Sequence, residues 1–86
     1  MEEIKETIEE IKETIMEFFR INNKADGLTD DTDLFKGGYV NSLFALQMVM
    51  YLEDAFKIKI KNKEITEKNF KTIDSIAGVV QRAQKK

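Results

Sequence analysis

The sequence GGYVNSLFALQMVMYLE, residues 37–53, decides the fold, because it leads a glycine-containing loop into a long apolar helix. The two glycines loosen the backbone, and Asn41 and Ser42 are both residue types that cap helix N-termini with a side-chain oxygen. Neither is followed three residues later by Glu or Gln, so no capping box is predicted and either residue could be the cap. The pattern predicts a helix over residues 42–56 with Ser42 at its start.

This helix is apolar on nearly all sides, which is unusual in a small domain unless something covers it. Its inward stripe, at about 100° per residue, comprises Ala45, Met48, Val49, Leu52 and Phe56. We expect Leu46, on a flank of this stripe, to be buried in the bundle. Two interpretations remain open for Leu43, Phe44, Gln47 and Met50: they are covered by the bundle, or they form a surface for partners beside Ser42.

Upstream, residues 2–19 are predicted to form the first helix. Its apolar stripe, spaced by three and four residues, comprises Ile4, Ile8, Ile11, Ile15 and Phe18. The heptad EEIKETI occurs twice, at residues 2–8 and 9–15, which raises the alternative of a coiled coil. Two heptads are fewer than the three to four that a coiled coil usually needs. The pattern therefore favours one amphipathic helix that packs on its own domain.

Between these helices, residues 20–40 are rich in turn-forming residues and predict a long loop. Leu28, Leu34 and Phe35 are expected to anchor it across the core, since an unanchored loop of this length is uncommon in a compact domain.

The acidic side chains of this loop require that a calcium site be considered. Counted from Asn22, an EF-hand frame would place Asp26 at its fifth position and Asp33 at its twelfth. The third position is Lys24, and the bidentate Glu that should end the frame is missing. Solvated loop acids are the favoured interpretation, and no metal site is predicted.

Downstream, residues 57–64, KIKIKNKE, alternate like a strand. Because a single strand would have no partner, we interpret them as an extended connector with Ile58 and Ile60 inward and the lysines in solvent. Residues 65–70 predict a short helix. The last helix is predicted over about 73–83, with Thr72 as its cap. Its apolar face comprises Ile73, Ile76, Val79 and Val80.

Together these segments predict an all-α fold, a four-helix bundle with three longer helices and one short helix, in a single domain over residues 1–86. The chain has no Cys and no His, which excludes a disulfide framework, thiolate metal sites and the commonest general base. No apolar run approaches the roughly 20 residues of a membrane span. The N-terminus is unlike a signal peptide, so a cytoplasmic protein is expected.

Charge is divided unevenly along the chain. Residues 1–56 contain 13 acidic and 5 basic side chains, whereas residues 57–86 contain 3 acidic and 9 basic ones. The division suggests charged partners or pairing within the chain. Nucleic acid is not an expected partner, because Phe70 is the only aromatic residue among the bases.

Gly38-x-x-Asn41-Ser42-Leu43, followed by LEDAF at residues 52–56 and the Ile-x-Ile segment, resembles the acyl carrier protein family over about residues 33–80. In that family the serine of an Asp-Ser-Leu triplet carries 4′-phosphopantetheine, so the resemblance implies this cofactor on Ser42. Asn41 stands where the family usually has Asp, which removes a charge beside the serine.

The resemblance further implies a non-catalytic carrier whose cofactor thiol holds acyl or aminoacyl groups as thioesters. Its expected partners are a phosphopantetheinyl transferase, an acyl- or aminoacyl-loading enzyme and downstream biosynthetic enzymes, and it is expected to be a monomer that binds no membrane. Partner recognition is expected at Asn41, Leu43, Phe44, Gln47 and Met50.

The subtype can be argued from the helix that follows Ser42. Carriers of fatty acid synthesis tend to display acids there, whereas residues 42–56 have acids only at Glu53 and Asp54. The stretch is similar to stand-alone carriers of polyketide and nonribosomal-peptide pathways, and a D-alanyl or peptidyl carrier is an alternative. A helical adaptor or coiled-coil domain, in which Ser42 only caps a helix, is the alternative outside the family.

Overall fold

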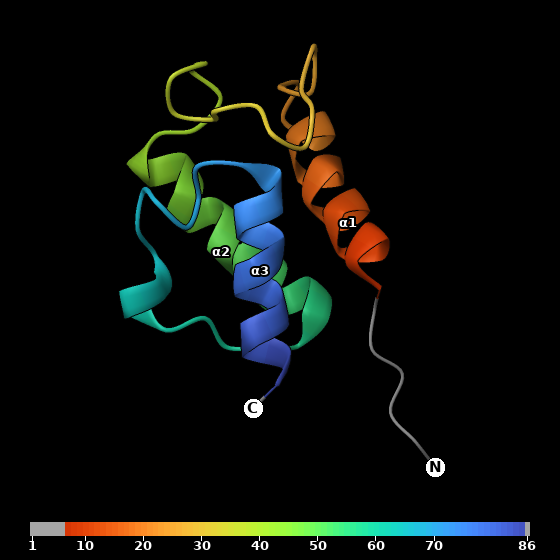
Figure 1. Ribbon diagram of the computed structural model, residues 1–86, viewed down its shortest axis with the longest axis vertical. Coiled ribbons are helices and arrows are strands. Elements are labelled where there is room, and N and C mark those ends of the chain that lie inside the picture. Colours follow the sequence, from red (N-terminus) through yellow and green to blue (C-terminus); the bar gives the residue numbers. More distant parts are fainter. Residues whose placement is uncertain (1–6, 86) are drawn as a thin grey trace.

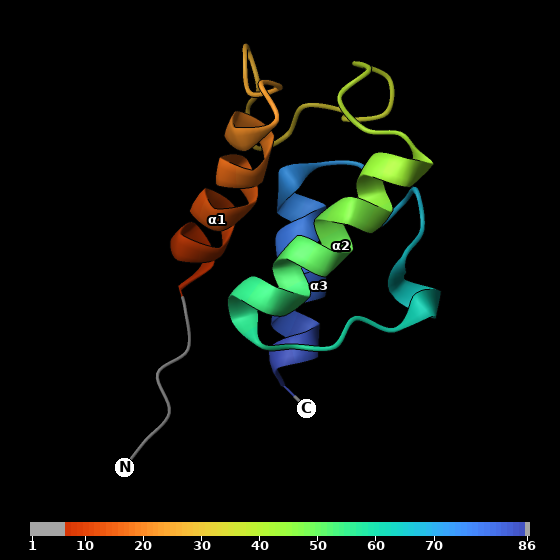
Figure 2. The same ribbon diagram turned by 180° about the vertical axis from the view of Figure 1, so that it is seen from behind.

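The computed structural model describes residues 7–85, and this part of the chain is all-helical (Figure 1). Its elements in chain order are α1 (Ile8–Ile21), α2 (Ser42–Phe56), the short 3-10 turn η1 (Asn62–Glu64) and α3 (Ile73–Gln84). In both views the end of α1, the start of α2 and the start of α3 lie at one end of the molecule, and the first loop crosses there (Figures 1 and 2). Buried side chains from all three helices form one core. No helix between residues 7 and 85 has the length and apolar character needed to cross a membrane.

A capping box starts α1. The Thr7 hydroxyl oxygen accepts the backbone N–H of Glu10 at 3.1 Å, and the Glu10 carboxylate accepts the Thr7 N–H at 2.9 Å. The buried face of α1 comprises Ile11, Ile15, Phe18 and Phe19. The predicted helix over 2–19 is confirmed from Ile8 onward, whereas Ile4 lies outside the described residues.

The first loop is anchored as predicted. Leu28 and Leu34 are buried, and Phe35 packs partly buried against the core. The loop is also tied to α3, because the Leu34 N–H donates to the Lys71 carbonyl at 2.7 Å just before that helix. These contacts fix the path of the chain that leads into α2.

The C-cap that follows α2 is Lys57, which adopts the left-handed conformation with φ +57° without being glycine. The following connector confirms the predicted alternation in part: Ile60 is buried and Ile58 partly so. The connector also contains η1, which the sequence pattern did not predict.

The short helix predicted over residues 65–70 is not a helix in the structure. These residues form a single turn, closed where the Phe70 N–H reaches the carbonyls of Thr66 and Glu67. So short a segment gains too few backbone hydrogen bonds to propagate a helix. The described fold therefore has three α-helices, and the fourth is not confirmed. The last helix is confirmed, since Thr72 caps α3 and the predicted apolar face is buried.

Candidate functional site

The start of α2 gives Asn41 and Ser42 different roles. Asn41 is the N-cap: its Oδ1 accepts the backbone N–H of Phe44 at 2.8 Å. Ser42 is the first residue inside the helix, and its side chain is exposed. Among residues 7–85, no hydrogen-bond partner holds the Ser42 hydroxyl. The choice of cap that the sequence left open is thus decided in favour of Asn41, and the Ser42 hydroxyl is available for chemistry.

The loop before α2 fixes where that hydroxyl lies. Val40 is buried, and its N–H donates to the carbonyl of Leu34 at 3.1 Å. The turn just before it needs glycine at two places. Gly38 has φ +79°, and a Cβ on Gly37 would come within 2.9 Å of the Tyr39 ring. The glycines therefore allow the chain to fold back tightly enough for Ser42 to emerge at the helix end.

A groove of about 280 Å³ opens directly beside Ser42. It runs between the first two turns of α2 and the turn over residues 65–70. Its lining comprises Phe35, Ser42, Ala45, Leu46, Ile65, Thr66, Glu67 and Phe70. The lining is mainly apolar, so the groove offers shelter to an apolar chain that starts at Ser42.

The outward side of α2 is apolar as well. Leu43, Leu46 and Met50 are 66%, 50% and 69% exposed, and Gln47 is exposed between them. Leu46 corrects the expectation of burial, because it borders the groove at the surface rather than entering the core. These four side chains, Leu43, Leu46, Gln47 and Met50, are called the α2 face below.

Phe44 does not belong to the α2 face. It is only 7% exposed, and its ring centroid lies 5.0 Å from that of Phe18 and 5.5 Å from that of Phe19. The Lys24 ammonium lies over the Phe44 ring, 4.9 Å from its centroid. Phe44 is therefore a core residue that joins α1 to α2, and its expected place on a partner surface is corrected.

The second serine of the chain provides a comparison. Ser75 is the only serine besides Ser42. It lies in the first turn of α3, partly buried, and its hydroxyl shares a 3.0 Å hydrogen bond with that of Thr72. Ser42 alone combines exposure, an unengaged hydroxyl and an adjoining groove.

The acids of the first loop do not converge. Asp30 pairs with Lys12 at 3.2 Å, and the Asp33 carboxylate accepts the N–H of Lys36 at 3.0 Å. Across residues 7–85, no three side chains of the types that bind metals gather at one point. Asp30 and Asp33 instead bind a cation and a backbone amide of the chain itself.

Comparison with known proteins agrees with the geometry of this site. Residues 9–80 match the family described as the phosphopantetheine attachment site. The chain is also 34% identical over 62 residues to a probable acyl carrier protein, PigG, of Serratia sp. (strain ATCC 39006). That similarity covers 72% of this chain and 71% of the relative. The chain therefore belongs to the acyl carrier protein family, whose members carry acyl groups on covalently attached 4′-phosphopantetheine.

Proposed function

We propose that Ser42 is the residue that carries the phosphopantetheine of this carrier. The observation that supports it most strongly is that Asn41 caps α2, which leaves the Ser42 hydroxyl exposed and unengaged at the helix start. Helix N-termini leave backbone N–H groups without intrahelical partners, and these favour a phosphate. A phosphodiester on Ser42 would therefore lie in a favourable field.

The groove beside Ser42 fits the same attachment. Its apolar lining by Leu46, Ile65 and Phe70 suits an acyl chain or the aliphatic part of the arm. When bound, the cofactor supplies the thiol that forms thioesters, which a chain without cysteine cannot provide itself. The chain contributes the attachment hydroxyl, the helix terminus and the sheltering groove.

Partner enzymes are proposed to dock on the α2 face beside Ser42. The first turn of α2 contains no acid, and Glu53 turns back to accept the Ile60 N–H at 2.9 Å. Recognition at this face would therefore depend on apolar contact more than on charge steering. This supports a stand-alone carrier of a polyketide or nonribosomal-peptide pathway, loaded by an acyl- or aminoacyl-transferring enzyme. We also propose that the carrier acts as a monomer.

The attachment is tested by intact mass after incubation with coenzyme A, magnesium and a promiscuous phosphopantetheinyl transferase. The transferase forms a bond from the serine Oγ to phosphorus and breaks the pyrophosphate bond of coenzyme A, releasing adenosine 3′,5′-bisphosphate. We expect one phosphopantetheine on the wild type and on Ser75→Ala, and none on Ser42→Ala. Loading of a folded Ser42→Ala variant, or no loading of the wild type, would refute the proposal.

A further inference from the structure

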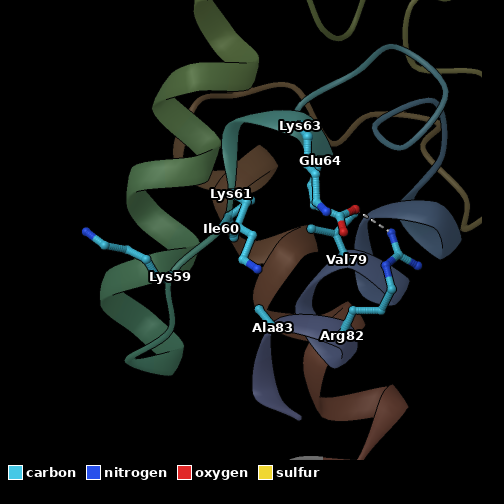
Figure 3. A pocket seen from close by; sticks show the side chains of 8 residues that line it. All are labelled: Lys59, Ile60, Lys61, Lys63, Glu64, Val79, Arg82 and Ala83. Carbon is cyan, nitrogen blue, oxygen red and sulfur yellow. Dashed lines mark hydrogen bonds and ion pairs between the residues drawn. The ribbon is translucent and has the colours of Figure 1, made fainter. Parts of the chain in front are cut away.

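A second hollow, of about 140 Å³, lies between the connector after α2 and the C-terminal half of α3 (Figure 3). Four cationic residues line it: Lys59, Lys61, Lys63 and Arg82. Its apolar lining comes from Ile60 and Val79, which are both buried, and from Ala83. We call this hollow the basic pocket.

The basic pocket already binds one carboxylate of the chain. Arg82 Nη2 donates to the Glu64 carboxylate at 2.9 Å, and Figure 3 shows the two side chains pointing toward one another. Arg82, Lys63 and Lys61 all lower the pKa of Glu64, with the Arg82 hydrogen bond as the largest cause. The positive charges that line the pocket therefore favour the ionised form of the Glu64 carboxylate.

Positive charge remains in the lining beyond this pair, because Lys59 and Lys63 also line the pocket and Glu64 is its only acidic lining residue. The bond to Glu64 uses one of the five N–H groups of the Arg82 guanidinium. Arg82 is about half exposed, so these N–H groups can be reached from solvent. A second carboxylate entering the pocket would meet cations from two separate elements, the connector and α3.

The surroundings of the pocket favour a protein occupant over a membrane or a nucleic acid. The large exposed apolar side chains of residues 7–85 are Ile21, Leu43, Leu46 and Met50, and none lines the basic pocket, as insertion into a membrane would require. No aromatic residue lines it either, so it offers nothing on which nucleic acid bases could stack. A hollow lined by both apolar and cationic side chains fits a peptide in which acidic and apolar side chains are neighbours.

We propose that the basic pocket is a docking site for an acidic segment of a partner enzyme, separate from the α2 face. The inference rests on the proposed carrier function and names the chemistry of a partner. Different residues line the two regions: Ile65, Thr66 and Glu67 line the groove at Ser42, whereas the connector residues that line the basic pocket are Lys59, Ile60, Lys61, Lys63 and Glu64. A partner held at the basic pocket would leave the groove and the arm free to react.

The test uses the phosphopantetheinylated protein, labelled with nitrogen-15 and titrated with a synthetic peptide in which glutamates flank leucines. We expect amide shifts concentrated at residues 59–64 and 79–83, which weaken as salt is raised. The same peptide with glutamine in place of every glutamate should cause no such shifts. Vesicles containing anionic lipid, tested alongside, should bind more weakly than the acidic peptide.

Matched variants separate a pocket from general attraction to a basic surface. The pocket variant is Lys59→Gln with Lys63→Gln, and the control is Lys36→Gln with Lys68→Gln, two exposed lysines outside the pocket. Both lose the same charge, but only the pocket variant should bind the peptide roughly fivefold more weakly or worse. Equal loss in both variants, shifts spread over the whole basic surface, or stronger binding to vesicles would overturn the inference.

Failure of this inference can be distinguished from failure of the proposed function. Lys59 and Lys63 lie outside the groove at Ser42, so the pocket variant should accept phosphopantetheine as fully as the wild type. A protein that is loaded on Ser42 but ignores the peptide would refute only the docking site. A protein that cannot be loaded would refute the attachment site first.

Discussion

Asn41 Oδ1 accepts the backbone N–H of Phe44 at 2.8 Å, so the cap of α2 is made by the residue immediately before Ser42. Because of this bond, the residue that stabilises the start of the helix is not the residue proposed to be modified. Asn41 satisfies a backbone donor that would otherwise lack a partner, and the neighbouring hydroxyl is left for a transferase. An uncharged residue performs the capping, although the family usually has Asp there.

The first prediction concerns these two neighbours. Asn41→Ala should lower the free energy of unfolding by about 1 kcal/mol, because it removes the cap, whereas Ser42→Ala should change it by only a few tenths. Urea denaturation followed by circular dichroism measures both. Equal losses in the two variants would mean that Ser42 shares the capping.

A third variant at the same position tests the role of charge. Asn41→Asp keeps a capping oxygen and adds a negative charge at the positive end of the helix dipole. We expect it to be more stable than the wild type by about 0.3–1 kcal/mol at low salt, and we expect salt to reduce the gain. A stability below that of the wild type at neutral pH would contradict this account.

The next prediction contrasts Phe44 with Met50 on the same helix. Phe44→Ala should cost about 3–5 kcal/mol, because it opens a cavity between α1 and α2. Met50→Ala should cost less than about 0.5 kcal/mol, since that side chain is exposed. Unfolding in urea distinguishes them. A loss of stability in Phe44→Ala as small as that in Met50→Ala would mean that Phe44 is not a core residue and belongs to the partner surface.

Phe44 and Leu46 also show what the sequence could not decide. Periodicity established that α2 has a buried stripe, and Ala45, Met48, Val49 and Leu52 are buried as predicted. Because an apolar helix shows little contrast between its faces, the sequence alone locates the edge of the buried stripe only to within about one residue. The rings of Phe18 and Phe19 pack against Phe44, so the buried side of α2 includes Phe44 and leaves Leu46 outside. This contact joins segments that are distant in the sequence, so no local pattern predicts it.

Turns were less predictable than helices for a related reason. The caps at Asn41 and Thr72 each depend on a hydrogen bond to a backbone N–H only three residues away, and both residues were candidates from the sequence. The segment after α2 depends on distant contacts. Glu64 binds Arg82 of α3 and Asn69 of the following turn, and η1 itself has no side-chain cap. The basic pocket is formed by these same contacts, so the alternating lysines alone could not reveal it.

Another prediction concerns Lys12, which links three parts of the chain. Its ammonium lies 3.2 Å from Asp30 in the first loop and 2.7 Å from Asp74 in α3. Hydrogen bonds to Asp74 and then Asp30 raise the pKa of Lys12 above 10.5. Lys12→Gln should therefore lower the melting temperature, by more at low salt than at high salt.

The pH dependence of the Lys12 effect has a definite sign. A raised folded-state pKa stabilises the fold fully below the unfolded value, and this contribution disappears as pH rises through the folded value. The difference between wild type and Lys12→Gln should thus persist at neutral pH and shrink only above pH 10.5. Lys36→Gln, at an exposed lysine, is the control and should leave the melting temperature nearly unchanged.

The last prediction uses Glu64 in the opposite pH range. Arg82 lowers the pKa of Glu64 below 4.5, so the ion pair stabilises the fold above that pH and the contribution is lost as pH falls through the folded value. Wild type should therefore be more stable than Glu64→Gln at neutral pH, and the two should converge in acid. Melting temperatures from pH 7 to pH 3 measure this. Glu67→Gln, at an exposed acid in the neighbouring turn, is the control. If the melting temperatures of wild type and Glu64→Gln differ by the same amount at every pH, Glu64 stabilises the fold through packing and neutral hydrogen bonds. The charges of the basic pocket would then contribute nothing to its effect.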